Sequence, residues 1–423
     1  MKKSLAVLAL AAVLAVGAVS TGCSNSGSGS GKVSITFLNS KGEISTQLEA
    51  AAKEFNSTNK DGITVTVSSV ASSSTVDETM LSKYASGNPA TISMVDPADI
   101  KTFADKSLDL SNESWVKNIT DSIKPSVTYN GKVMAFPFGV EGYGMIYNKT
   151  TIEKATGKTF DPSSIKSLSD LEALYKQIQA GGVTPVQISH DDWSLASHFM
   201  GTLFCLQSDP TSYESQLKAG TADVAQNSDF TGLLNLLDLN KNYNVYKSSP
   251  MSSDYSTTDP QNIATGKVAF WFNGNWVWPN VKQFLTGSHA NDQFGIMPMF
   301  VSSKTSNSIV AGASKMILID KTKSTAAQQK AANEFLNWFV TNSDGQKALV
   351  NDMGIAPAFS NITLQPNGLS ESIVQYVKSG NIVSTVSFPG DFYTKLGVPM
   401  QQYLVGKADR TTVAKAFDAY FKS

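Results

Sequence analysis

The stretch from residue 32 to residue 70 constrains the fold most, because it alternates between two kinds of sequence pattern. KVSITFL and GITVTVSSV are rich in β-branched residues, which indicates two strands. Between them Ile44, Leu48 and Phe55 recur at helical spacing. Strand–helix–strand units usually form parallel sheets with right-handed crossovers. This stretch therefore predicts an α/β fold.

The same alternation continues along the chain. VDETMLSKYASG reads as a helix closed by Gly87, and TISMVD as a third strand. Further helices are predicted at STAAQQKAANEFLNWFV, at TTVAKAFDAYFKS and at SLSDLEALYKQIQAGG, the last with a capping box of Ser169 and Glu172. About 400 residues follow the N-terminal segment, more than one hydrophobic core usually holds. We therefore expect two lobes.

The N-terminal segment has the features of an export signal. Lys2 and Lys3 precede an apolar stretch from Leu5 to Val19, and small residues follow it. A helix of this length extends about 22 Å, short of the roughly 30 Å hydrocarbon layer of a membrane. We therefore expect a signal peptide over residues 1–22, followed by a Gly/Ser linker that ends at residue 31.

Cys23 follows Gly22 in a pattern that resembles the lipobox of bacterial lipoproteins. The resemblance implies that Cys23 is acylated and anchors the exported chain to the outer face of the cell membrane. The match departs at Ser20, where the lipobox usually has leucine, and an ordinary signal peptide that contains a cysteine is the alternative. The linker favours the lipid, since a flexible tether suits a folded domain held at a membrane.

Composition disfavours several classes of partner and cofactor. The net charge of −1 makes nucleic acid an unexpected partner. Arg410 is the only arginine among 34 basic residues, which disfavours an anionic ligand because the arginine fork binds carboxylate and phosphate best. The histidines lack metal-ligand spacing and there is no phosphate loop, so neither metal nor cofactor is expected. Cys205, in the apolar stretch FMGTLFC, is expected in the core.

Three ordered segments carry a family resemblance: YNGKVMAFPFGVEGYGMIYNKTTIEKATG (129–157), ATGKVAFWFNGNWVWPNV (264–281) and AANEFLNWFVTNSDGQKALV (331–350). The chain resembles the extracellular solute-binding proteins of ABC importers, in the carbohydrate-binding family that includes maltose-binding protein. The resemblance implies a periplasmic-binding-protein-like fold, in which two hinged lobes close on a ligand in the cleft between them. It implies an N-lobe of residues 32–140 and 309–358, and a C-lobe of residues 141–308 and 359–423.

Tryptophans in two segments are candidate ligand contacts. In FWFNGNWVW (270–278), Trp271 lies between two phenylalanines and reads as a buried strand residue, whereas Trp276 follows an Asn-Gly turn. An indole ring has a broad apolar face with a negative π surface, on which a sugar ring can stack. The resemblance implies this role for Trp276, Trp278 and Trp193; burial in the core is the alternative for Trp276 and Trp278.

Polar candidates accompany these rings. The resemblance implies that Glu141, at the first lobe crossing, reaches into the cleft, with Tyr143 on the same face of its strand; a hinge salt bridge is the alternative for Glu141. Asp191 and Asp192 precede Trp193 and are expected to accept sugar hydroxyls or to cap a helix. Strand ends and a C-terminal loop supply the remaining candidates: Asn39, Lys41, Glu43, Asp96 and Asp391.

The expected function is that of a monomeric, non-catalytic sugar-binding lipoprotein. It would deliver its ligand to the permease subunits of an ABC importer, which a cytoplasmic ATPase drives. Members of the same family bind polyamines, so a cationic ligand held by carboxylates and aromatic rings is one alternative. An exported glycoside hydrolase is another, with Glu141 and either Asp191 or Asp192 as its carboxyl pair.

Overall fold

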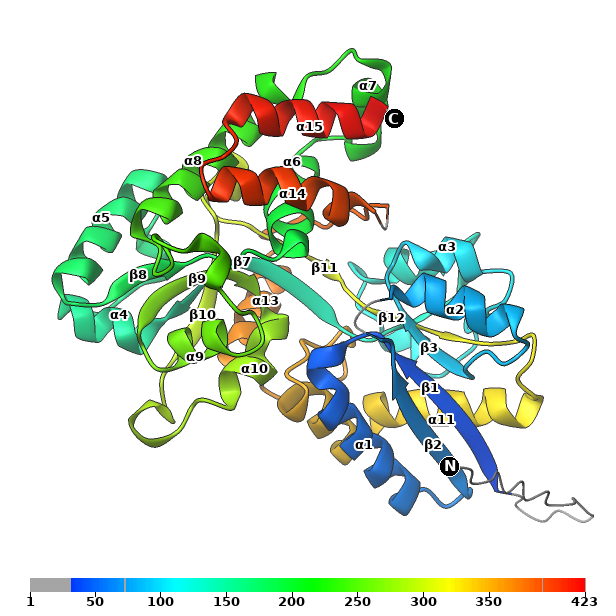
Figure 1. The fold of residues 1–423 in the computed structure, drawn as a ribbon. Helices are drawn as coiled ribbons and strands as arrows, with labels where there is room; N and C mark the ends of the chain where they lie inside the picture. Colours follow the sequence, from blue (N-terminus) through cyan, green and yellow to red (C-terminus); the bar gives the residue numbers. More distant parts are fainter. Residues whose placement is uncertain (1–31, 72–73, 390, 423) are drawn as a thin grey trace, which may run out of the picture.

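The computed structural model describes residues 32–71, 74–389 and 391–422. The predicted signal peptide, Cys23 and the linker lie outside these residues. Figure 1 shows two lobes side by side, each built on its own sheet with helices around it. The predicted α/β class with two lobes is confirmed. No helix in the described ranges is long and apolar enough to cross a membrane.

The first lobe contains a five-stranded sheet in the order β2-β1-β3-β12-β6. β1 pairs in parallel with β2 and with β3, as the strand–helix–strand pattern predicts, and β12 pairs antiparallel with β3 and β6. Phe55 of α1 and Phe335 of α11 meet with ring centroids 5.0 Å apart beneath this sheet, in the core of the lobe. The strands are β1 (Val33–Asn39), β2 (Ile63–Ser69), β3 (Ile92–Val95), β6 (Phe136–Pro137) and β12 (Met316–Ile319); the helices are α1 (Ser45–Thr58), α2 (Val76–Ala85), α3 (Asp99–Phe103), α11 (Ala326–Thr341) and α12 (Ser343–Lys347). A short hairpin joins β4 (Thr128–Tyr129) to β5 (Lys132–Val133).

The second lobe contains a six-stranded sheet around β7, which pairs antiparallel with β9, β10 and β11. β8 lies parallel to β9, and β13 parallel to β11. The strands are β7 (Val140–Asn148), β8 (Thr184–Gln187), β9 (Val268–Gly274), β10 (Phe294–Met297), β11 (Ile309–Ala313) and β13 (Ile382–Ser384). The helices are α4 (Lys149–Thr156), α5 (Leu168–Ala180), α6 (Thr202–Cys205), α7 (Pro210–Ala219), α8 (Ser228–Tyr243), α9 (Thr258–Ala264), α10 (Trp278–Lys282), α13 (Gly368–Lys378), α14 (Phe392–Leu404) and α15 (Arg410–Lys422).

The chain crosses between the two sheets at three segments, and the first, which contains Phe138 and Val140, is hydrogen-bonded to the other two. Phe138 N donates to Lys315 O (2.9 Å), and Val140 N donates to Ala356 O (2.9 Å). The sequence prediction begins the N-lobe return at residue 309, but β11 pairs with β7 and β13 in the second sheet. The chain therefore crosses after Ala313. The other predicted lobe limits stay a proposal.

Two local predictions are confirmed and one is wrong. Cys205 is buried, and Trp271 is fully buried with its indole N–H donating to Ser189 Oγ (2.9 Å). The capping box predicted at Ser169 is wrong, because α5 begins at Leu168 and its N-cap is Ser167, whose Oγ accepts from Asp170 N (3.2 Å). Ser167, rather than Ser169, therefore accepts the free backbone N–H in the first turn of α5.

Candidate ligand-binding cleft

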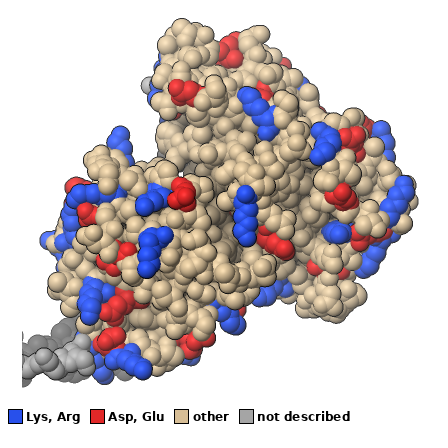
Figure 2. Space-filling model, turned by 180° about the vertical axis from the view of Figure 1, so that it is seen from behind, with Lys and Arg blue, Asp and Glu red and all other residues tan. Residues whose placement is uncertain are grey.

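A cavity of about 800 Å³ lies between the two lobes. In the first lobe it borders the carboxyl ends of β1, β2 and β3, the edge at which open α/β sheets place ligands. Seen from behind, the surface carries lysines and carboxylates interspersed, with no large patch of one sign (Figure 2). The cavity between the lobes is therefore the candidate site.

The first lobe lines the cavity with hydroxyl and charged side chains. We call these residues the polar wall: Ser40, Lys41, Glu43, Ser74, Thr75, Asp77, Asp96, Asp99 and Thr102. Such groups accept and donate hydrogen bonds without offering a stacking surface.

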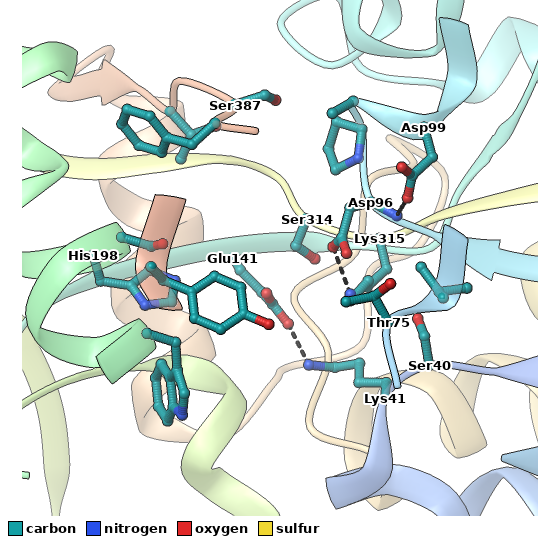
Figure 3. A pocket seen from close by; sticks show the side chains of 18 of the residues that line it. Ser40, Lys41, Thr75, Asp96, Asp99, Glu141, His198, Ser314, Lys315 and Ser387 are labelled. Carbon is teal, nitrogen blue, oxygen red and sulfur yellow. Dashed lines mark hydrogen bonds and ion pairs between the residues drawn. The ribbon is translucent and has the colours of Figure 1, made fainter. Parts of the chain in front are cut away.

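Lys41 is the most buried charge of the polar wall, at 3% exposure. Its Nζ lies 2.5 Å from an oxygen of Glu43. It also lies 2.5 Å from an oxygen of Glu141 on β7, and Figure 3 shows this second ion pair. Burial acts to lower the pKa of Lys41, but the two carboxylates outweigh it and raise that pKa above its usual value. One ammonium thus serves two carboxylates, and the Lys41–Glu141 ion pair joins the two lobes.

A second ion pair joins the polar wall to the crossing after β11. Lys315 Nζ lies 2.5 Å from Asp96 Oδ1, and Asp99 Oδ2 accepts from Asp96 N (3.1 Å). Burial and the negative charge of Asp96 raise the pKa of Asp99 to about 6. The labelled side chains of Asp96, Lys315 and Asp99 face the same space as Lys41 and Glu141 (Figure 3).

The second lobe lines the cavity with rings. We call these residues the aromatic wall: Tyr143, Trp193, His198, Tyr255, Trp276, Phe388 and Tyr393. Several are in mutual contact: His198 and Trp276 have centroids 4.8 Å apart at 34°, and Trp193 and Tyr255 meet edge-on at 4.9 Å. Ring-to-ring contact of this kind holds these four side chains in place before a ligand arrives.

A π-helix over residues 194–200 carries part of the aromatic wall. π-helical turns are rare and occur frequently at functional sites. This one brings the rings of Trp193 and His198, five residues apart, to 5.5 Å. Burial lowers the pKa of His198 to about 4, so its imidazole is neutral at pH 7. The aromatic wall therefore adds no positive charge to the cavity.

Comparison with known proteins identifies the family. Residues 50–376, more than half of the chain, match the family model described as bacterial extracellular solute-binding protein. The chain belongs to this family.

Solved structures of other solute-binding proteins share the fold. RafE in complex with raffinose superposes with a TM-score of 0.74 at 19% identity, over 92% of this chain and 99% of that one. A sugar transporter from Bacillus licheniformis in complex with stachyose gives 0.71 at 17%, over 92% and 99%. A chitin oligosaccharide binding protein gives 0.71 at 19%, over 92% and 98%. The predicted two-lobed, periplasmic-binding-protein-like fold is thereby confirmed.

Most of the sequence-predicted contact residues of this solute-binding protein line the cavity. They are Trp276, Trp193, Glu141, Tyr143, Lys41, Glu43 and Asp96. Glu141 combines the two roles that the sequence left open, since its carboxylate lines the cavity and also forms the interlobe ion pair.

The other predicted residues lie outside the cavity lining. Asn39 is buried, and its side chain accepts from Lys41 N (2.9 Å) and donates to Lys41 O (3.0 Å), which fixes the turn after β1. Trp278 begins α10 and packs against Phe294. Asp391 lies outside the cavity, where its carboxylate binds Lys395 (2.8 Å).

Asp191 and Asp192 precede the π-helix and are half-buried beside the cavity. Asp192 Oδ1 accepts from Trp193 N (2.7 Å), and Asp191 O accepts from Leu195 N (3.0 Å). Burial raises the pKa of Asp191. Neither side chain makes a cap hydrogen bond to the helix, and Asp191 Oδ2 is buried without a hydrogen-bond partner among the described residues. Both roles expected from the sequence, capping and ligand contact, therefore stay predictions.

Among the chemically distinctive residues that line the cavity, sequence reasoning missed six: Asp77, Asp99, His198, Lys315, Tyr255 and Tyr393. Asp99 carries the one local signal, since it follows the third predicted strand closely, as Asp96 does. Within the described residues no group of three or more His, Cys, Asp or Glu is placed to hold a metal ion.

Proposed function

We propose that this solute-binding protein captures an oligosaccharide between its lobes. The observation that carries the proposal is the pairing of an aromatic wall with a polar wall across one cavity. A sugar ring presents apolar C–H faces and a rim of hydroxyls, so the rings suit its faces and the carboxylates and hydroxyls suit its rim. The complexes of related folds with raffinose and stachyose support the same ligand class.

Export and delivery are part of the proposal. The chain is secreted by its signal peptide, anchored through an acylated Cys23, and monomeric. It hands its ligand to the transmembrane subunits of an ABC importer, which a cytoplasmic ATPase drives. Family membership supports the extracellular location and the importer partner.

A cationic ligand such as a polyamine is the second candidate, and the charges of the cavity favour it. Two lysines line the cavity against five carboxylates: Glu43, Asp77, Asp96, Asp99 and Glu141. An amine could sit against the aromatic wall through cation–π contact. The ion pairs of Lys41 and Lys315 already occupy three of these carboxylates, which makes the oligosaccharide the first choice.

We propose no catalytic role. A glycoside hydrolase needs two carboxyl groups facing each other across the scissile bond. Neither Asp191 nor Asp192 lines the cavity, and the carboxylate of Glu141 is paired with Lys41. These positions do not support the acid–base pair considered from the sequence.

Thermal unfolding with added ligand tests the proposal. The purified protein is heated alone and with raffinose, stachyose, a chitin oligosaccharide or spermidine. A ligand at a hundred times its Kd adds about 2.7 kcal/mol to the free energy of unfolding, a shift of a few degrees in Tm. A shift with an oligosaccharide, lost in Trp276→Ala, supports sugar capture at the aromatic wall. A shift with spermidine alone assigns the amine instead.

A further inference from the structure

We propose that Gly274 is the positioning residue for the Trp276 ring, acting through its lack of a side chain. The inference rests on the proposed function, in which Trp276 is a stacking surface for the ligand. It assigns a role in binding to a residue that does not itself line the cavity.

The ring of Trp276 lies directly against Gly274, the last residue of β9. A Cβ atom placed on Gly274 would lie 2.1, 2.3 and 2.4 Å from three carbons of the six-membered ring of Trp276, where ordinary contact begins at 3.4 Å. The ring would have to withdraw by more than an ångström to admit one methyl group. The indole therefore occupies the space that a side chain at Gly274 would fill.

Tyr143 and His198 contact the Trp276 ring, so a withdrawing ring would press on them or move into the cavity. Tyr143 pairs with Gly274 across β7 and β9, and its ring meets that of Trp276 at 6.2 Å and 63°. His198 lies 4.8 Å from the indole centroid. An aromatic ring that covers a glycine on a sheet is a known stabilising arrangement, and here it also presents the ring to the cavity.

The backbone beside Trp276 is fixed as well. Asn275 Oδ1 accepts from Gly142 N (3.1 Å), while Asn275 Nδ2 donates to Ser370 Oγ (3.1 Å) and to Val140 O (3.3 Å). These bonds tie the residue between Gly274 and Trp276 to the start of β7 and to α13. The strain from an added Cβ would thus fall on the ring rather than on the main chain.

Backbone conformation gives no other reason for glycine at this position. Gly274 has φ −119° and ψ 175°, an extended conformation that alanine adopts freely. Replacement of a glycine by alanine at a compatible φ and ψ even stabilises a protein slightly, by restricting the unfolded chain. A penalty from Gly274→Ala must therefore come through contact with the Trp276 ring.

A double-mutant cycle tests this coupling. Gly274→Ala, Trp276→Ala and the double variant are compared with the wild type by calorimetric titration with raffinose, stachyose and a chitin oligosaccharide, and by thermal unfolding without ligand. We expect Gly274→Ala to weaken oligosaccharide binding about tenfold or more, as Trp276→Ala does, and the double variant to bind no more weakly than Trp276→Ala. Without ligand, Gly274→Ala should lower Tm in the wild-type background and leave it unchanged or raised in the Trp276→Ala background.

Gly42→Ala is the matched control, because a Cβ on Gly42 would meet no atom within 4 Å; it should retain wild-type affinity. Unchanged affinity in Gly274→Ala, where Trp276→Ala loses it, overturns the inference. So does an equal loss of Tm from Gly274→Ala in both backgrounds, which would mean a backbone requirement. If the wild type binds none of the sugars, the proposed function fails, and the Tm cycle alone then decides whether Gly274 positions the ring.

Discussion

The two walls of the cavity differ in what they offer a ligand. Of the described residues that line the cavity, those from the first lobe include no aromatic ring, whereas the second lobe supplies all seven rings of the aromatic wall. The polar wall instead concentrates charge, and its best-buried member, Lys41, is held between two carboxylates. One wall is therefore suited to stacking and the other to hydrogen bonding.

Under the proposed function, this difference gives the two lobes different parts in binding. Rings already packed on one another present a formed surface to a ligand in solution. Hydrogen bonds from the opposite wall strengthen as lobe closure removes water from between them. We therefore expect substitutions of paired charges in the polar wall to act mainly on stability, and substitutions of tryptophans in the aromatic wall to act mainly on affinity.

The largest expected effect is in the polar wall. Lys41→Met leaves Glu43 and Glu141 facing each other without their shared ammonium, so we expect a loss of about 3 kcal/mol or more in the free energy of unfolding. Urea unfolding at pH 7 measures it. Lys330→Met, which removes an exposed i,i+4 pair with Glu334, should change stability by less than about 0.5 kcal/mol. Similar small losses in both variants would mean that solvent already screens the Lys41 cluster.

The pH dependence of stability tests the burial of His198 in the aromatic wall. Its pKa in the folded protein is about 4, below the ordinary 6.5, so the unfolded chain takes up a proton first as pH falls. The contribution of His198 to the free energy of unfolding is fully present above pH 6.5. It falls by about 2–3 kcal/mol as the pH falls from 6.5 to about 4. His198→Phe keeps a ring without the titration, so its free energy of unfolding should fall less over this range. An unchanged slope in His198→Phe would refute the assignment.

Substitutions of Trp193 and Trp278 distinguish a ring that stacks on the ligand from a ring that packs inside the protein. Trp193 lines the cavity, whereas Trp278 packs against Phe294. Trp193→Ala should weaken oligosaccharide binding about tenfold, the order expected for loss of one stacking ring. Trp278→Phe should keep wild-type affinity even if it lowers Tm. Calorimetric titration with the sugar that shifts Tm provides both values, and equal losses would show that the aromatic wall is wider than the cavity lining indicates.

The fold was predictable from the sequence where patterns are local. The unit of β1, α1 and β2 follows from β-branched runs around one helical periodicity, and no distant residue is needed to recognise it. The point after β11 at which the chain crosses between the lobes was not predictable, because the pairing of β11 with β7 joins segments far apart in the chain. A boundary set by such pairing has no local sequence signal.

The site was predictable only in part, for the same reason. Trp276 and Trp278 are two residues apart, but the strand ends at Gly274 and the chain then turns into a short helix. Alternation along a strand therefore does not say which ring faces the cavity. His198 reaches the cavity through a π-helix, whose spacing differs from the α-helical one that sequence reasoning assumes.

The smallest expected effect concerns Asp99 of the polar wall, whose pH dependence of stability has the opposite sign to that of His198. The pKa of Asp99 is raised to about 6 in the folded protein, so the folded state holds the extra proton between about pH 3.8 and 6, and stability falls as pH rises through this range. Asp99→Asn removes that penalty, and its amide oxygen can still accept from Asp96 N. We expect a gain of about 1 kcal/mol at pH 7, a value reduced for the partial exposure of the carboxyl group.

Urea unfolding of Asp99→Asn across pH 4–7 measures this gain, with the exposed Asp121→Asn as a control that should leave stability within about 0.5 kcal/mol of the wild type. A loss of stability at pH 7 would mean that the ionised Asp99 carboxylate stabilises the turn after β3 more than its burial costs. The polar wall would then be organised by the hydrogen bond to Asp96 N rather than strained by crowded negative charge. Its carboxylates would be poised to accept hydroxyls at neutral pH, whereas the predicted gain would mean that the wall tolerates Asp99 at the expense of stability.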